Sequence, residues 1–483
     1  MTHHHHPMIP LREIDPSQSF IDDAAIWAQL DQITNPSQTQ VEAVLEKGRQ
    51  AQGLSLADTA VLLQNSDPAL DEQLFAAARE IKDAIYGNRM VLFAPLYVSN
   101  HCANACAYCA FNADNHQLKR KTLKADEIDQ EVSVLLSKGH KRLLAVYGEH
   151  PRNSAERIVD SIRTMYATRL AAKDGEGHAI RRINVNCAPM DTEDFRTLKT
   201  AQIGTYQCFQ ETYHRDTYEQ VHTKGKKKDY LYRLYAMHRA MEAGIDDVGI
   251  GALFGLYDHK FELLALLQHA QQLETDYGVG PHTISFPRIE PAQGSDLSEQ
   301  PPHAIDDHTF KKIVAILRLA VPYTGLILST RETPEIRREL INMGVSQISA
   351  ASRTYPGAYA AAETEREDEQ QFTLGDHREI DEVIHDLVTN LDSIPSFCTG
   401  CYRKGRTGDH FMGLAKQKFI RTFCQPNALI TFREYLNEFA SERTREAGNA
   451  LIEKELEAMT PARAKNVRKC LDKTDQGQRD IYL

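Results

Sequence analysis

Three cysteine residues lie within eight positions of the stretch NHCANACAYCAFN, at Cys102, Cys106 and Cys109. Thiolates bind zinc and iron–sulfur clusters, so the spacing Cys-x3-Cys-x2-Cys predicts a metal centre. A structural zinc site needs four protein ligands, and the nearby His101 and His116 leave that alternative open. Three thiolates instead suit a [4Fe–4S] cluster, in which one iron stays free to bind a substrate or cofactor.

A second group of three cysteine residues lies near the end of the chain, in SFCTGCYRKGRTGDHFM and the segment that follows it. Cys398 and Cys401 form a Cys-x2-Cys pair, and Cys424 lies 22 intervening residues further on. A zinc ribbon would need a second Cys-x2-Cys pair, which this segment lacks. The pattern therefore predicts a second cluster with an open position. Three further cysteine residues are expected only to be buried: Cys187, Cys208 and Cys470.

The elements that must position these groups follow a regular alternation. Short apolar runs rich in β-branched residues alternate with amphipathic helical patterns, which is typical of parallel strands buried on both faces. The eight runs span residues 90–100, 142–150, 181–189, 205–213, 247–255, 282–291, 325–332 and 346–353. Eight such units predict an α/β fold, a (β/α)8 TIM barrel, with the first cysteine loop directly after its first strand. Active sites of such barrels lie at that end of the strands.

Three parts of the chain are expected. Residues 1–88 show helical spacing and form an N-terminal extension, residues 89–377 form the barrel, and residues 378–483 form a helical C-terminal domain that carries the second cluster. The polar stretch at 354–379 is interpreted as a loop or linker.

Composition narrows the classes of function. The formal charge of −11 argues against nucleic acid or an anionic membrane as partner. No apolar run is long enough to span a membrane, and the start lacks the apolar core of a signal peptide. Nine cysteine residues in such a chain indicate metal or redox ligands rather than disulfides, and hence a cytoplasmic protein. The His3–His6 run is given no catalytic role.

The first cysteine motif, with an aromatic residue just before its last cysteine, resembles the radical S-adenosylmethionine superfamily. The resemblance implies that the open iron chelates S-adenosylmethionine, whose reductive cleavage yields a 5′-deoxyadenosyl radical. Glu149, in YGEH, resembles the acid that meets the methionine amino group, and Arg239 the arginine that meets its carboxylate. Asn186 and Glu211 are placed to reach ribose hydroxyls, although either is equally expected as a solvated strand-end residue. The cofactor-binding residues implied by resemblance are therefore Tyr108, Gly148, Glu149, Asn186, Glu211 and Arg239.

The combination of both cysteine groups on one barrel resembles the HydG-type tyrosine lyases that mature [FeFe]-hydrogenase. The resemblance runs from about residue 75 to the end and includes IYGNRMVLFAPLYVSN, GVGPHTISFPR and CYRKGRTGDHFM. It implies cleavage of tyrosine to p-cresol and dehydroglycine, and conversion of the latter to carbon monoxide and cyanide on iron at the second cluster. Ser329 and Arg331, in LSTRE, resemble the pair that holds the tyrosine carboxylate. The implied partners are an electron donor such as ferredoxin or flavodoxin and other hydrogenase maturation proteins.

This sequence departs from that family at one position. Some members of the family bind an additional iron at the second cluster through a histidine. Gln272 stands where the imidazole is expected, and His269 is the nearest substitute.

Two rival functions stay open. The first is the related tyrosine lyase of thiamine biosynthesis, 2-iminoacetate synthase, which lacks a second cluster. The second is a zinc-stabilised scaffold without turnover.

Overall fold

The structure, a computed structural model, describes residues 14–172, 177–361, 369–404, 407–416 and 420–483, so the His3–His6 run lies outside the described residues. Eight parallel strands follow one another around a closed barrel, and β1 pairs with β2 to close it. The eight strands coincide with the eight predicted runs, which confirms the predicted fold class. They are β1 (Arg89–Ser99), β2 (Arg142–Tyr147), β3 (Arg182–Asn186), β4 (Tyr206–Gln207), β5 (Val248–Gly251), β6 (Thr283–Ser285), β7 (Gly325–Leu328) and β8 (Gln347–Ser349).

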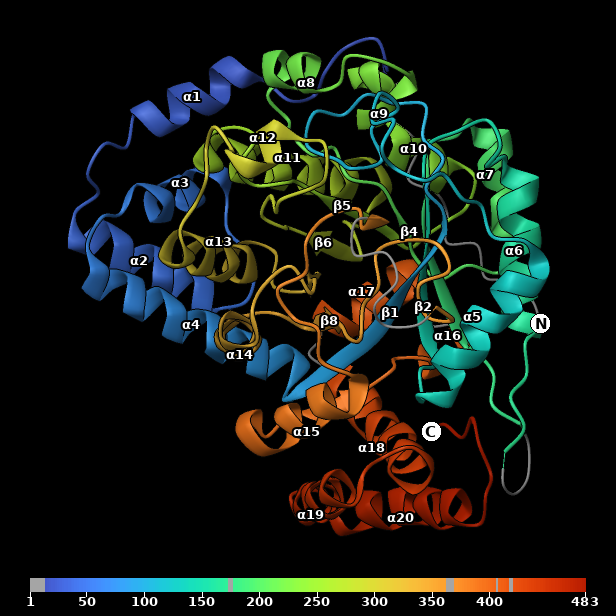
Figure 1. The fold of residues 1–483 in the computed structure, drawn as a ribbon. Helices are drawn as coiled ribbons and strands as arrows, with labels where there is room; N and C mark the ends of the chain where they lie inside the picture. Colours follow the sequence, from blue (N-terminus) through green and yellow to red (C-terminus); the bar gives the residue numbers. More distant parts are fainter. Residues whose placement is uncertain (1–13, 173–176, 362–368, 405–406, 417–419) are drawn as a thin grey trace.

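The helices fall into three groups (Figure 1). The N-terminal group comprises α1 (Asp23–Asp31), α2 (Gln38–Arg49), α3 (Leu56–Gln64) and α4 (Pro68–Tyr86). The barrel group comprises α5 (Ala125–Ser137), α6 (Ala155–Ala167), α7 (Thr192–Lys199), α8 (Arg215–Val221), α9 (Tyr230–Leu234), α10 (Ala236–Glu242), α11 (His259–Tyr277), α12 (Asp296–Glu299), α13 (Asp307–Ala320) and α14 (Pro334–Met343). The tail group comprises α15 (Ile380–Leu391), α16 (Gly400–Arg403), α17 (Gly408–Lys416), α18 (Ile420–Glu438), α19 (Glu442–Glu457) and α20 (Pro461–Asp475).

Local sequence sets the limits of α4, the helix that leads into the barrel. Asp67 caps its first turn by accepting from the Ala69 N–H, and Pro68 occupies a first-turn position where no N–H is needed. Gly87 ends it at φ 65°, a conformation that favours glycine. The chain then enters β1 within two residues, while α4 packs against α2 and α13.

β1 is the longest strand and connects the two ends of the barrel. Its 11 residues are all buried, and at about 3.3 Å per residue they span roughly 33 Å. Its later residues pair with β2, its early ones with β8 and with β9 (Ile394–Ser396). β9 belongs to the tail, so the segment after residue 378, expected as a helical domain, also contributes one strand. The tail is thereby attached to the barrel sheet through backbone hydrogen bonds.

The helical segment between β4 and β5 is interrupted at Tyr235, which separates α9 from α10. Tyr235 has φ −87° and ψ 12°, so its backbone leaves helical geometry at this residue. Several helices therefore separate β4 from β5.

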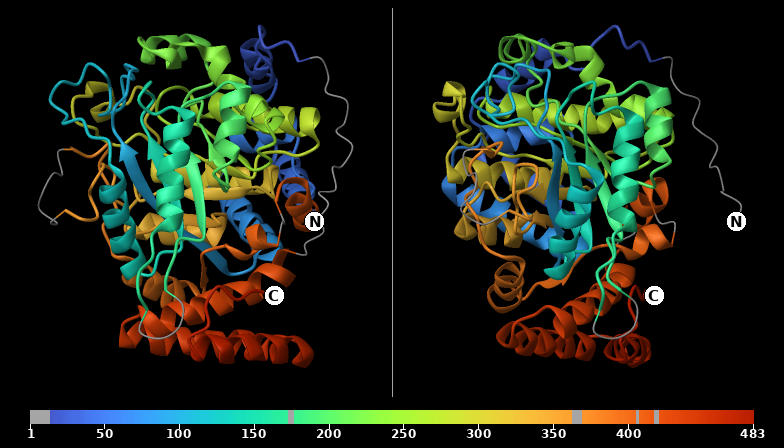
Figure 2. Two further views of the ribbon diagram at one scale, coloured as in Figure 1. Left: turned by 90° about the vertical axis from the view of Figure 1, so that its right-hand side faces the viewer. Right: turned by 45° about the vertical axis from the view of Figure 1, so that its right-hand side comes forward.

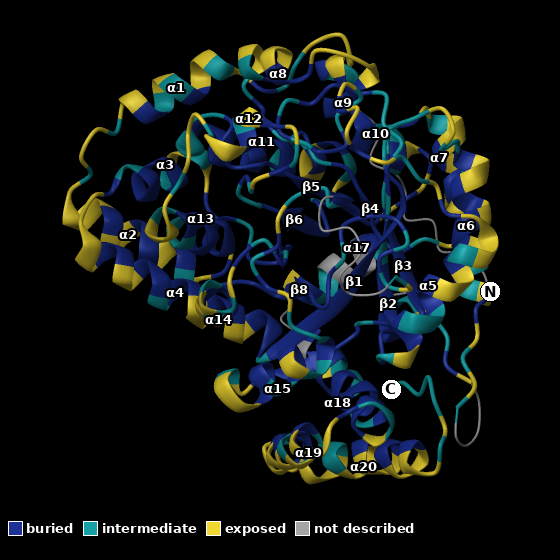
Figure 3. Ribbon diagram, viewed as in Figure 1, coloured by how far each residue is buried: buried dark blue, intermediate teal, exposed yellow. Residues whose placement is uncertain are grey.

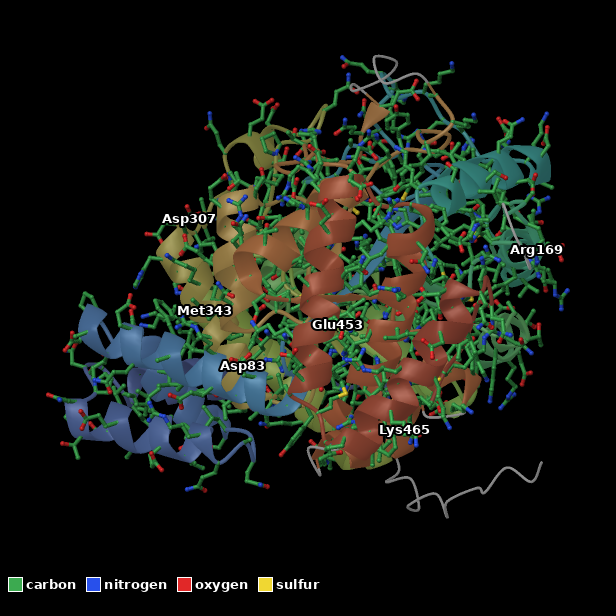
Figure 4. The ribbon with its side chains drawn as sticks, turned by 90° about the horizontal axis from the view of Figure 1, so that it is seen from below. Asp83, Arg169, Asp307, Met343, Glu453 and Lys465 are labelled. Atoms are coloured by element: carbon green, nitrogen blue, oxygen red, sulfur yellow. The ribbon has the colours of Figure 1, made fainter. Side chains whose placement is uncertain are left out.

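The tail helices lie in a layer beneath the barrel (Figure 2), where α18 packs on β9, α19 and α20. Seen from below, this layer covers the barrel end, with Glu453 on α19 and Lys465 on α20 labelled (Figure 4). The barrel strands are buried, whereas exposed residues follow the outer faces of α1, α2, α19 and α20 (Figure 3). Within the described ranges, no helix combines the length and apolar character needed to cross a membrane.

Candidate functional site

The first cysteine group occupies the loop after β1, at the carboxyl ends of the strands, which we call the mouth of the barrel. Cys106 is buried and the other two cysteine residues are partly exposed. Their thiols lie close enough to perturb one another, and burial raises the pKa of the Cys106 thiol to about 12. A metal centre here must displace bound protons, and three convergent thiols on one loop fit a cluster that has one open position. We call Cys102, Cys106, Cys109 and their surroundings the mouth site.

The YGEH element after β2 is bonded directly to this loop. The Ala103 N–H donates to the Glu149 carbonyl at 2.8 Å, and the Asn104 side-chain amide donates to the Glu149 carboxylate. Gly148 lies so close that a Cβ there would be 2.3 Å from the His101 carbonyl oxygen. A glycine is therefore required at this position, for the close approach of two backbones.

Two carboxylates and two cations alternate beside the cysteine loop. Arg233 donates to Glu149, while Lys227 Nζ lies 2.9 Å from Glu211 Oε1. Burial acts to raise the pKa of Glu149, but Arg233 and Lys227 outweigh it, so that pKa lies below its ordinary value. Glu211 is held at φ 74°, a strained conformation for a non-glycine residue. Fixed charges of both signs suit a zwitterionic ligand such as an amino-acid group.

The structure does not bring Arg239 to this site. Its Nε donates to the Met190 carbonyl at 2.8 Å, and its Nη2 donates to the Tyr232 carbonyl at 2.6 Å. Arg233, six residues earlier on α9, occupies the position beside Glu149.

A cavity of about 180 Å³ adjoins the mouth site. It brings together most of the remaining predicted residues, which come from four different loops and strand ends. Among the residues that line it are Tyr108, Cys109, Asn186, Glu211, Ser329 and Arg331. The Tyr108 side chain is held in place by a hydrogen bond, because its hydroxyl lies 2.7 Å from His222 Nε2.

Arg331 places a partly buried cation at the cavity wall. Its Nη1 donates to the Arg288 carbonyl at 3.3 Å, and its backbone N–H donates to Ser329 Oγ at 3.4 Å. Burial lowers its pKa although the nearby carboxylates of Glu290 and Glu211 act to raise it, and within the described part of the chain it forms no direct ion pair. A guanidinium that lines a cavity without a direct carboxylate partner can bind a carboxylate ligand through charge-assisted hydrogen bonds.

The polar stretch interpreted as a linker contributes two cavity residues that the sequence analysis missed. Phe372 lies flat against Arg331, with the guanidinium carbon 3.4 Å from the ring centroid. Gln371 Nε2 donates to Cys109 Sγ at 3.6 Å. Polar composition concealed them, because a loop folded over a site and a free linker have similar composition.

The second cysteine group lies at the opposite end of the barrel, near the first residues of the strands. Cys398 follows β9, Cys401 lies on α16 and Cys424 on α18, and all three line one small pocket with Arg89. A hydrogen bond with Cys424, together with burial, raises the pKa of Cys401. Cys398 adopts φ 49°, a left-handed conformation that is strained for cysteine. We call this pocket the floor site.

Arginine residues begin β1, β2 and β3 around the floor site. Arg89 is only 4% exposed, and among the described residues its Nε and Nη1 find no hydrogen-bond partner. Burial acts to lower the Arg89 pKa, but the neighbouring thiols raise it above its ordinary value. Arg182 Nη1 donates to the Cys398 carbonyl at 3.4 Å, and Arg142 is also fully buried. Buried guanidinium groups need a negative partner, and a three-thiolate iron–sulfur cluster fits that requirement.

The histidine considered for an additional iron lies elsewhere. His269 Nδ1 is 2.9 Å from the Tyr213 hydroxyl, and Gln272 donates to Asp276 within α11, so both side chains have partners away from the floor site. His282, directly before β6, instead faces Asp247, which accepts from the Tyr402 hydroxyl next to Cys401. His282 is thus the buried histidine connected with the floor site.

Comparisons with known families agree with this arrangement. Residues 96–269 match the Radical SAM superfamily. Residues 285–390 match the Biotin and Thiamin Synthesis associated domain. The chain is 32% identical to 2-iminoacetate synthase of Salmonella typhimurium over 73% of its own length and 90% of that protein. It is 30% identical to the Escherichia coli enzyme of the same name over 81% of its own length and 98% of that protein.

Two solved structures resemble almost the whole chain. One is HydG, a maturase of the [FeFe]-hydrogenase, at 45% identity and a TM-score of 0.91, covering 96% of this chain and 100% of that chain. The other is HydG from Carboxydothermus hydrogenoformans, at 39% identity and a TM-score of 0.80, covering 93% and 97%.

Proposed function

Because the chain belongs to the HydG-type radical S-adenosylmethionine maturases, we propose that it cleaves tyrosine between Cα and Cβ and converts the smaller product to carbon monoxide and cyanide for an [FeFe]-hydrogenase. Tyrosine divides into p-cresol and dehydroglycine without loss of an atom. Dehydroglycine in turn divides into carbon monoxide, hydrogen cyanide and water. One substrate therefore contains every atom of both diatomic products.

The mouth site supports the first half of this proposal. When bound through Cys102, Cys106 and Cys109, a [4Fe–4S] cluster together with S-adenosylmethionine supplies the radical that starts the cleavage. Glu149 is ionised and held to receive the methionine amino group, and Arg233 stands beside it in place of Arg239. Asn186 and Glu211 lie on the cavity wall within reach of a ribose.

Arg331 and Ser329 are proposed to hold the tyrosine carboxylate. A charge-assisted bond to this guanidinium fixes the amino acid in one orientation, which is positioning rather than proton transfer. Phe372 packs against Arg331, with the guanidinium carbon 3.4 Å from the ring centroid, and so holds the cation in place. Dehydroglycine hydrolyses in water, so it must react further inside the protein before water reaches it.

The floor site is the observation that supports the second half of the proposal, the conversion of dehydroglycine to carbon monoxide and cyanide. Three cysteine residues from separate elements converge at the far end of the barrel, beside a buried Arg89. The HydG structures cover 96% and 93% of this chain, whereas the Salmonella typhimurium 2-iminoacetate synthase covers 73% of it. We propose that a second cluster binds here and holds the iron that receives carbon monoxide and cyanide, with the buried His282 beside Asp247 as the candidate imidazole for an additional iron.

The test is to change Cys398 and Cys401 to serine and to assay both products anaerobically. The mouth site alone suffices for p-cresol, so p-cresol should persist while carbon monoxide trapped by a haem protein disappears. The matched control is Cys470→Ser, which changes a buried cysteine of α20 outside both sites. Carbon monoxide at the control rate would reduce the tail cysteines to a structural role and leave the 2-iminoacetate synthase reaction as the function.

A further inference from the structure

The segment 371–375 crosses the mouth of the barrel and is tied to three of its loops. The Ala110 N–H, next to Cys109, donates to the Gln371 carbonyl at 3.4 Å. The Thr373 N–H donates to Pro291 after β6 at 2.9 Å, and the Gly375 N–H donates to Thr330 after β7 at 2.8 Å. These backbone bonds fix the segment over the cavity independently of its side chains.

Gln371 uses both ends of its side-chain amide inside the site. Its Oε1 accepts from the Tyr97 hydroxyl at 2.7 Å, and its Nε2 donates to Cys109 Sγ at 3.6 Å. A ligating thiolate can only accept, so the NH2 group must face the sulfur and the carbonyl oxygen must face the phenol. Tyr97 therefore orients the amide, and the chain of contacts runs from the cavity wall to a cluster ligand.

We propose that Gln371 is a positioning residue of the mouth cluster, whose N–H bond to the Cys109 thiolate raises the reduction potential of that cluster. The inference rests on the proposed function, in which Cys109 is a cluster ligand. Reduction adds negative charge that is shared with the ligating sulfurs, so a donor to a sulfur stabilises the reduced state more than the oxidised one. Tyr97 acts one step further away, because its hydroxyl keeps the amide from rotating.

This assignment explains why the donor is an amide rather than a cation. A lysine or arginine at this position would compete with Arg331 for the substrate carboxylate, since both side chains line the same cavity. A neutral amide polarises the sulfur without adding a second charge. Gln371 thus separates the control of the cluster from the binding of the amino acid.

The test is a redox titration of the full chain, followed by electron paramagnetic resonance. The mouth cluster is identified as the signal that changes when S-adenosylmethionine is added. Gln371→Met keeps the side-chain length but removes the N–H, so its potential should shift to a lower value. Gln371→Glu should shift it further because a carboxylate faces the thiolate, and Tyr97→Phe should shift it less. Thr373→Val, two residues away with an exposed side chain, is the matched control and should not shift it.

A structural role and a redox role give different outcomes. If Gln371 tunes the potential, 5′-deoxyadenosine formation by Gln371→Met should fall with a weak reductant and recover with a stronger one, at full iron content. If the S-adenosylmethionine-sensitive cluster had the same reduction potential in Gln371→Met and in Thr373→Val, the role of Gln371 would be disproved while the proposed function would stand. The absence of any S-adenosylmethionine-sensitive signal in the unchanged protein would instead overturn the proposed function.

Discussion

The mouth site and the floor site both collect three cysteine residues, but they differ in how the surrounding charge is balanced. At the mouth, cations and carboxylates are paired, as in Arg233 with Glu149 and Lys227 with Glu211. At the floor, Arg89 is buried without an ion pair among the described residues. The paired charges beside the mouth cysteines suit the amino-acid part of a zwitterionic ligand, whereas the buried Arg89 at the floor suits an anionic cluster. The two ends of one barrel are therefore built for different ligands.

The largest expected effect comes from removing the mouth cysteines. Changing Cys102, Cys106 and Cys109 together to alanine should abolish 5′-deoxyadenosine formation, because no other group supplies the radical. The floor cluster should remain, so iron and sulfide should fall only in part. Substantial deoxyadenosine from this variant would contradict the assignment of these three cysteines to the radical-forming cluster. Cys470→Ser again serves as the control.

A smaller effect is expected from Arg331→Ala, which removes the proposed carboxylate partner. A charge-assisted hydrogen bond contributes roughly 1.5–3 kcal/mol, so tyrosine should bind about ten- to a hundredfold more weakly. Deoxyadenosine formation should then become uncoupled from p-cresol release, as product ratios would show. Arg338→Ala, on the same side of the barrel but paired with Asp386, should change neither. An unaltered tyrosine dependence in Arg331→Ala would exclude that residue from the site.

Comparing Arg233→Gln with Arg239→Gln tests the charge balance of the mouth directly. Loss of Arg233 leaves the Glu149 carboxylate without its closest cation, and S-adenosylmethionine should bind about tenfold more weakly. Arg239→Gln should leave that affinity unchanged, because Arg239 is bonded to loop carbonyls outside the cavity. The affinity of each variant is measured by titration with S-adenosylmethionine, followed by the spectroscopic change of the cluster. The opposite ranking would restore Arg239 to the role that sequence resemblance implied.

The smallest effect is expected from Arg89→Gln at the floor. Replacing the cation by an amide should lower the reduction potential of the floor cluster, because its reduced state loses a favourable charge. The mouth cluster, near the other end of the roughly 33 Å strand, should keep its potential. Redox titration with and without S-adenosylmethionine separates the two signals. Equal shifts in both clusters would mean that the variant disturbs the barrel as a whole.

The alternation of apolar runs and amphipathic helices was enough to predict the eight-stranded barrel, and the cysteine loop after its first strand followed from local order. These features depend on residues that are close in sequence, so spacing and periodicity record them. Gly148 was also singled out from the sequence, by its place directly after the second strand, although the contact with His101 that requires a glycine depends on the pairing of β1 with β2. For the strands and the cysteine loop, the tertiary structure adds distances but does not change what the sequence predicted.

Other features appeared only when distant segments came together. Arg233 rather than Arg239 pairs with Glu149, and this depends on a contact between residues 84 positions apart in the sequence. Gln371 and Phe372 lie about 260 and 40 residues from the partners they contact, Cys109 and Arg331, so composition could describe their segment only as polar. β9 joins the sheet only because β1 is long enough to extend past β8. In each case the deciding quantity is a contact between groups far apart in sequence, and such contacts exist only once the chain has closed around its core.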